Sequence, residues 1–165
     1  MAREVFQQEL KEVQERLVEI ASDVTRIMQI ASHSFTKSDV AIADQAISLA
    51  ELTGDKALAL DELVIRILAR QSPVARDLRI LVSALRISAS LERMGALAGH
   101  IAQIARFRYP GSAIPESLRA TFVEMGVLDL ALANKIVKLL ADPDVDVARS
   151  IQAEDERVDE LHRHV

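Results

Sequence analysis

Apolar residues in the first thirty positions recur at alternating spacings of four and three, and this pattern constrains the fold more than any other feature. It is the a/d heptad pattern of an α-helix that packs lengthwise on its neighbours. The apolar positions are Phe6, Leu10, Val13, Leu17, Ile20, Val24, Ile27 and Ala31. Charged residues fill the other faces, and the polar stretch Ser32 to Ser38 interrupts the pattern. We therefore predict a long packed helix that ends at this stretch.

Turn signals predict four further helices. Ser38-Asp39 offers two good N-cap residues for a second helix. Ser72-Pro73 is expected to end that helix and to open a third, with Ser72 as its N-cap and Pro73 in its first turn. Tyr109-Pro110-Gly111-Ser112 is a loop signal that ends the third helix near residue 108. Ile114-Pro115-Glu116 opens a fourth helix, and Asp142-Pro143-Asp144 separates it from a fifth that is expected to run to residue 165.

One face of the second helix is made mostly of small residues, so the backbone of a neighbouring helix can come close there. Asp61 is an exception because it lies in phase with this apolar face. The other positions of the face are Val40, Ala43, Ile47, Ala50, Gly54, Ala57, Val64 and Leu68.

Composition excludes several classes of protein. The chain has no Cys, which excludes a disulfide scaffold, a thiolate metal site and a cysteine nucleophile. Five Gly and four Pro are too few for a loop-rich sandwich or a disordered chain. The first residues are charged throughout and no apolar stretch is long enough to span a membrane, so the cytoplasm is the expected compartment. What remains is an all-α protein of long packed helices.

A weak internal repeat divides the chain into two parts. Lys37-Ser38-Asp39-Val40 corresponds to Asp142-Pro143-Asp144-Val145 at an offset of 105 residues, and the order of long helix, turn and long helix repeats. We therefore predict tandem antiparallel three-helix bundles. Residues 1–109 would form the first bundle, and residues 113–165 would form the first two helices of an incomplete second bundle.

Charge is distributed unevenly along the chain. Residues 63–110 contain eight Arg against Asp77 and Glu92, a balance of +6, whereas residues 1–62 balance at −6 and residues 111–165 at −5. The arginines can form a solvated, internally paired face, or they can form a docking surface for an acidic partner, with Arg76 and Arg79 as its candidates. A nucleic-acid partner is not expected, because no aromatic residues lie between the arginines and the net charge is −5.

The sequence contains none of the common catalytic or nucleotide-binding motifs, so we predict no catalytic residues. Carboxylates on helices are the remaining candidates for chemistry. Asp155 and Asp159 lie four apart on one helix face, followed by His162, and such a face can supply ligands to a metal in a helical bundle. The alternative is an acidic solvated turn. Glu92, within a stripe of small residues, is a further candidate metal ligand, and the alternative there is a rim residue paired with an arginine.

Several segments resemble the PhoU family of bacterial phosphate-signalling regulators. The most specific are Pro73-Val74-Ala75-Arg76-Asp77-Leu78-Arg79 and Leu91-Glu92-Arg93-Met94-Gly95, and the similarity continues in order to Glu154-Asp155-Glu156-Arg157-Val158-Asp159. The resemblance implies two three-helix bundles, a cytoplasmic location and a homodimer. It also implies partners, namely a phosphate ABC transporter and a sensor histidine kinase, with contact to the membrane only through them.

The resemblance implies metal sites as well, held by E(D)-x-x-x-D motifs on the second and third helices of each bundle. In the first bundle Glu92 matches, but Ala50, Gly54 and Ala96 stand where carboxylates are expected, so we predict that this site is absent. In the second bundle Asp155 and Asp159 match and would bind a divalent or iron ion, with partners from a sixth helix. The chain is accordingly expected to be a version truncated before that helix.

These observations favour a non-enzymatic regulator of phosphate uptake and phosphate-starvation signalling that acts by docking. Two alternatives stay open. The first is a carboxylate-bridged di-metal enzyme of the helical-bundle type, and the second is a plain helical oligomerisation module.

Overall fold

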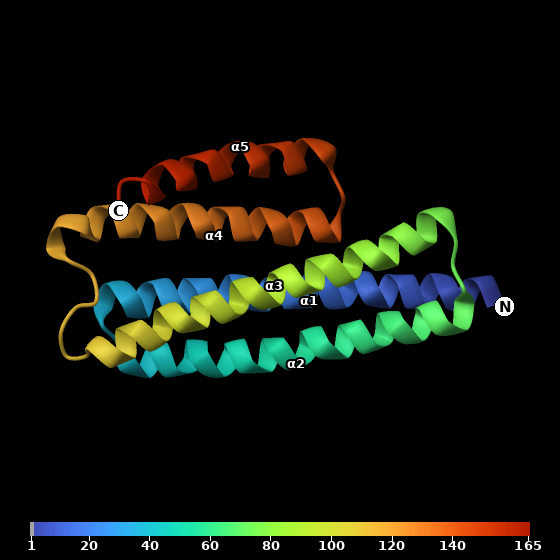
Figure 1. The fold of residues 1–165 in the computed structure, drawn as a ribbon, viewed down its shortest axis with the longest axis horizontal. Helices are drawn as coiled ribbons and strands as arrows, with labels where there is room; N and C mark the ends of the chain where they lie inside the picture. Colours follow the sequence, from blue (N-terminus) through green and yellow to red (C-terminus); the bar gives the residue numbers. More distant parts are fainter. Residues whose placement is uncertain (1) are drawn as a thin grey trace.

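The computed structural model describes residues 2–165, with side chains from Glu4 on, and every regular element in that range is helical (Figure 1). This confirms the all-α prediction. The elements are α1 (Ala2–Lys37), α2 (Val40–Gln71), α3 (Ala75–Arg108), the 3-10 turn η1 (Glu116–Leu118), α4 (Arg119–Ala141) and α5 (Val145–His162). Across this range, none of the helices has the length and apolarity needed to cross a bilayer.

Helices α1, α2 and α3 pack against one another as a three-helix bundle, and the predicted heptad of α1 points into its core. Ile20 and Ile27 of α1 are at most 1% exposed, as are Leu60 and Ile67 of α2 and Leu81 of α3. Burying a side chain of this size stabilises a fold by about 1.5–3 kcal/mol. The bundle therefore rests on aliphatic residues spaced at three and four along each helix.

Small residues let α2 and α3 approach closely, as the sequence predicted. A Cβ added to Gly99 of α3 would lie 3.1 Å from the Cβ of Ala50 of α2. Gly95 is one turn earlier, and a Cβ there would meet Val24 and Ile27 of α1 at 3.4 and 3.6 Å. Gly95 and Gly99 thus face different neighbours, and together they fix how deeply α3 sits between α1 and α2.

Two of the predicted helix ends are wrong in the first half of the chain. The stretch Ser32 to Lys37 is helical, and the hydroxyls of Ser34 and Thr36 hydrogen-bond to carbonyls one turn earlier in α1, so they do not end the helix there. Ser72 does not cap α3. It ends α2 in the left-handed conformation, with φ 44°, and Val74 precedes α3 in extended conformation. The N-cap predicted for α2 is confirmed, since Asp39 accepts from the backbone N–H of Ile42 at 3.1 Å.

Two corrections also apply to the second half. The segment after Pro115 begins with the 3-10 turn, and α4 itself starts at Arg119. The last helix ends at His162 rather than continuing to residue 165. The predicted turn between α4 and α5 is confirmed, and Asp144 caps α5 by accepting from the backbone N–H of Asp146 at 2.7 Å.

Helix α4 packs along α1, and α5 packs only against α4 within the described residues (Figure 1). The Gln14 side chain of α1 donates to the carbonyl of Leu140 at 2.9 Å, and the Phe35 and Phe122 rings meet edge-on at 5.7 Å. Apolar residues of α4, among them Ile136, pack against the same core as the first three helices. The division into bundles at residues 109 and 113 stays a prediction, and α4 shares the first bundle's core through α1.

Candidate docking surface

The two arginines predicted to dock a partner lie at the start of α3 and are exposed. Arg76 is the second residue of the helix, and Arg79 follows one turn later. The positive end of the helix dipole makes this an unfavourable place for a cation, by about 0.3–1 kcal/mol. Neither side chain makes an ion pair or hydrogen bond with any described residue. Their charges are therefore available to an external partner.

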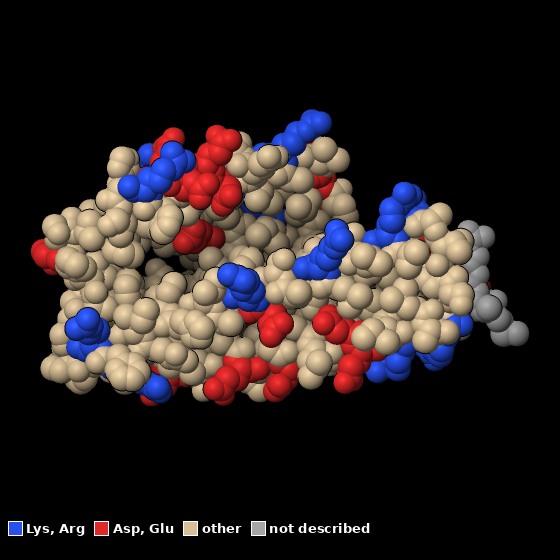
Figure 2. Space-filling view, in the orientation of Figure 1, with Lys and Arg blue, Asp and Glu red and all other residues tan. Residues whose placement is uncertain are grey.

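Arg79 is the first of three exposed arginines spaced seven residues apart, and we call Arg79, Arg86 and Arg93 the basic row. A spacing of seven keeps residues on one helix face, about 10.5 Å apart. Basic side chains accordingly follow the line of α3 on the face drawn in Figure 2. Arg86 and Arg93 also have no ion pair within the described chain. Arg86 and Arg93 were not among the predicted docking residues, although their spacing from Arg79 was a usable signal.

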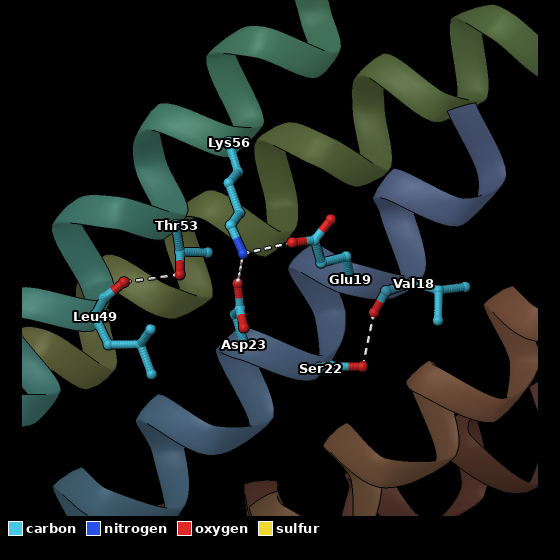
Figure 3. A network of polar contacts seen from close by, with 7 residues as sticks. All are labelled: Val18, Glu19, Ser22, Asp23, Leu49, Thr53 and Lys56. Carbon is cyan, nitrogen blue, oxygen red and sulfur yellow. Dashed lines mark hydrogen bonds and ion pairs between the residues drawn. The ribbon is translucent and has the colours of Figure 1, made fainter. Parts of the chain in front are cut away.

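Some cations elsewhere in the bundle are paired with carboxylates, as Lys56 shows. Lys56 of α2 reaches across to α1, where its Nζ lies 2.6 Å from Glu19 Oε1 and 2.6 Å from Asp23 Oδ2 (Figure 3). The hydrogen bond to Asp23 raises the pKa of Lys56 most, and the hydrogen bond to Glu19 raises it further. The hydroxyls of Thr53 and Ser22 lie beside this group. Each donates to a backbone carbonyl of its own helix, Thr53 to Leu49 and Ser22 to Val18, both at 2.8 Å. The Lys56 network therefore joins α1 to α2 and contains no unpaired cation.

Three arginines of the positive segment are also paired inside the bundle. Arg106 contacts Asp44 at 3.0 Å, and Arg70 pairs with Glu9. Arg66 lies 4.0 Å from Glu62 on the same helix. Arg70 and Arg106 thus join helices, Arg66 pairs within α2, and the other arginines of the segment have no partner among the described residues. The internally paired interpretation of the charge block holds for these three, and the docking surface stays a prediction.

The structure places the predicted metal ligands apart. Asp155 and Asp159 are exposed on α5, and Glu92 is exposed on α3. Asp129 of α4 is half-buried and lies near Asp155. Burial raises the pKa of Asp129, and the negative charge of Asp155 raises it further by a smaller amount. Among the described residues, no three His, Asp or Glu side chains come together as a metal site requires. The described residues alone do not assemble a metal centre. The metal at Asp155 and Asp159 stays a prediction, and it needs the further ligands expected from a sixth helix.

A groove between α1 and α2 is the other surface feature of note. It has a volume of about 570 Å³ and is lined by polar and apolar side chains that include Arg26, Asp44, Gln45 and Leu52. None of the predicted site residues lies in it. The predicted docking arginines are thus on an open helix face.

Long amphipathic helices packed as a bundle and an unpaired basic face on α3 characterise the described part of the chain. Comparison with known proteins shows which class this is. The PhoU domain family matches residues 17–105, from within α1 to near the end of α3. The chain belongs to the PhoU family.

Curated relatives match almost the whole chain. It is 37% identical over 163 residues to the phosphate-specific transport system accessory protein PhoU homolog 2 of Mycobacterium tuberculosis, covering 99% of this chain and 76% of the relative. PhoU homolog 1 of the same species is 36% identical over 163 residues and is covered to 74%. A PhoU homolog of Rhizobium meliloti is 28% identical over 157 residues, which is 95% of this chain and 66% of the relative.

Proposed function

We propose that this protein is an accessory regulator of phosphate transport that works by binding other proteins and not by catalysis. The observation that carries the proposal is the unpaired arginine face of α3, in a chain whose relatives are named as phosphate-specific transport system accessory proteins. Docking needs an exposed surface with unsatisfied charge, and α3 supplies one. Its place of action is the cytoplasm, where the cytoplasmic components of a transporter are accessible.

The partners in this proposal are a phosphate ABC transporter and a membrane sensor histidine kinase. The resemblance to PhoU proteins supports them, and so does the sign of the free charge. A positive helix face favours an acidic patch on the partner and speeds its diffusional encounter. Through these contacts the protein restrains phosphate-starvation signalling when phosphate is plentiful, and it reaches the membrane only through its partners.

The test is charge reversal at the start of α3. The double variant Arg76→Glu, Arg79→Glu should lose co-purification of the transporter and kinase components and should relieve repression of a phosphate-starvation reporter. The matched control is Arg149→Glu, Arg163→Glu, with the same change of charge at exposed positions of α5 and its end. Circular dichroism verifies that both variants stay folded. Unchanged capture by the α3 variant would rule out this surface.

No observation specifically favours either alternative function, the di-metal enzyme or the oligomerisation module. A di-metal enzyme needs an assembled ligand set, and the described residues form none. An oligomerisation module without partners predicts no capture of transporter or kinase components by the unaltered protein, so the same experiment decides it.

A further inference from the structure

Ion pairs close most of the seam between α1 and α2, but not the part nearest the connection between these helices. Near the start of α1, Glu9 pairs with Arg70. In the middle, Lys56 of α2 bridges two carboxylates of α1 (Figure 3). Residues 22–33 of α1 and 42–52 of α2 form no ion pair with each other among the described residues. This unclosed part of the seam contains the groove described above.

The groove consists of two overlapping cavities of about 570 and 620 Å³, and we call them together the α1–α2 groove. The two cavities share Arg26, Ile30 and Gln45. Half-buried side chains, namely Ile30, Ile42 and Leu49, supply apolar surface to it. Cavities of this size that combine apolar surface with a few polar groups are typical of sites for small molecules.

Most polar side chains of the α1–α2 groove are donors without partners. Arg26, Gln29, Gln45 and Ser48 line it, and their side chains bond to no other described residue. An arginine carries five N–H donors, and a glutamine carries two. By contrast, Gln14, earlier on α1, donates to a carbonyl of α4 at 2.9 Å. The groove therefore combines a permanent positive charge with several free donors from both helices.

The carboxylates near the groove do not neutralise Arg26. Asp44 lines the groove, but it contacts Arg106 of α3 at 3.0 Å. Asp39 caps the start of α2 by accepting a backbone N–H at 3.1 Å. Glu51 is exposed and forms no ion pair with Arg26 or any other described residue. An anion that enters the groove thus meets an arginine whose charge is uncompensated.

We propose that the α1–α2 groove binds a small molecule through its phosphate group. The planar fork of a guanidinium matches phosphate oxygens, which it can bind in pairs. A phosphate group has a charge of about −1.5 to −2 and three strong acceptor oxygens. It can therefore accept from Arg26 and from glutamines of both helices at once, whereas a carboxylate has only two oxygens. This inference goes beyond the proposed function, because it concerns a small ligand and needs neither the α3 surface nor a transporter.

The size of the groove and its apolar surface favour a phosphate ester over inorganic phosphate. Leu52, at one end of the groove, is 58% exposed. Together with Ile30 and Leu49 it can pack against a planar or apolar body such as a nucleobase. Inorganic phosphate would leave this apolar surface in water. Because Arg26 belongs to both cavities, a phosphate bound there leaves room for the rest of the ligand on either side.

The α1–α2 groove and the α3 docking surface do not compete. The seam between two helices of a three-helix bundle faces away from the third helix, and every lining residue belongs to α1 or α2. Helix α4 packs on α1 and not on α2, so it does not bridge the groove. A ligand can therefore bind while Arg76 and Arg79 contact a partner.

Backbone amide chemical shifts in NMR titrations of the unaltered chain test the site. The probes are adenosine monophosphate (AMP), inorganic phosphate and adenosine at constant ionic strength. AMP should shift the amides of residues 22–33 and 42–52 and not those of α5. Adenosine, which has no phosphate, should bind at least about tenfold more weakly than AMP. Stronger binding of AMP than of inorganic phosphate would identify an ester as the ligand, and equal binding would identify free phosphate.

Single substitutions locate the phosphate contact. Arg26→Gln should weaken binding of the phosphate probes by at least about tenfold. The matched control is Arg86→Gln, which removes the same charge from an exposed, unpaired arginine that does not line the groove and should leave binding unchanged. Circular dichroism verifies that both variants stay folded. No shift with either phosphate probe, an equal loss in both variants, or binding of succinate as tight as that of AMP would overturn the proposal.

Discussion

Helix α5 is attached to the rest of the chain through α4 alone, and we predict that Leu161→Ala releases it without unfolding the bundle. Leu161 is 6% exposed, and it is the one buried side chain among the described residues of α5. Val147, Ile151 and Val158 are only half-buried. The ion pairs between α4 and α5, Lys135 with Glu154 and Arg157 with Glu124, are partly exposed and each contribute roughly 0.2–1 kcal/mol.

The expected loss follows from these contacts. Leu→Ala in a core costs about 2–5 kcal/mol, and the lower half of that range applies because water can enter at the edge of the molecule. A loss of about 2–3 kcal/mol corresponds to a roughly 30- to 150-fold larger opening constant. Most of the stability of a protein helix comes from tertiary packing of its apolar face, and α5 has only 18 residues. Once undocked, α5 should therefore also lose its backbone protection.

Amide hydrogen exchange measures this directly. In Leu161→Ala the amides of residues 149–158 should exchange about 30- to 150-fold faster, while the amides of α1, α2 and α3 keep their rates. The control is Val145→Ala, at the exposed start of the same helix, where the side chain is 67% exposed. Equal acceleration throughout the bundle would refute independent docking of α5. No acceleration in α5 would refute the role of Leu161.

Three further predictions concern the core, a titrating carboxyl and a metal. Ile27→Ala should lower the free energy of unfolding by about 2–5 kcal/mol in urea titration, whereas Ile104→Ala, at a side chain 48% exposed, should change it little. The raised pKa of Asp129 means that the unfolded state ionises first, so stability falls as pH rises from 3.8 through the folded-state pKa. Asp129→Asn should remove that fall and stabilise the protein at pH 7 in metal-free buffer, as thermal unfolding across pH will show. Elemental analysis after incubation of this chain with iron or a divalent ion should detect no stoichiometric metal, because the described residues assemble no full ligand set around Asp155 and Asp159, and bound metal that Asp155→Asn or Asp159→Asn removes would contradict this.

The local signals in the sequence were reliable for the helix interiors and weaker at their ends. The heptad from Phe6 to Ala31 predicted the buried face of α1 because a period of three and four has one structural meaning over many turns. Ser72 was assigned to the wrong helix because a polar residue before Pro can end one helix or begin the next. Which of these happens depends on the backbone conformation, and Ser72 ends α2 because its backbone is left-handed, with φ 44°.

The predictions for individual site residues show the same contrast between local signals and tertiary contacts. Exposure of Arg76 and Arg79 could be expected from charge density alone. Which arginines are paired could not be expected from the sequence. Arg106 pairs with Asp44, for example, and the two residues are 62 positions apart in the chain. The contact between Asp129 and Asp155 was also missed. Asp129 was interpreted as a rim residue, and its burial arises only when α5 folds back over α4.

The sequence by itself determined the helical class, the number of helices, the buried stripe of α1 and the family, because periodicity and motifs are properties of the chain. Only the tertiary structure decided which faces meet and which charges stay free. Pairing between helices depends on their register, and here the register follows from one close contact between Gly99 and Ala50. That contact brings together two residues that are far apart along the chain.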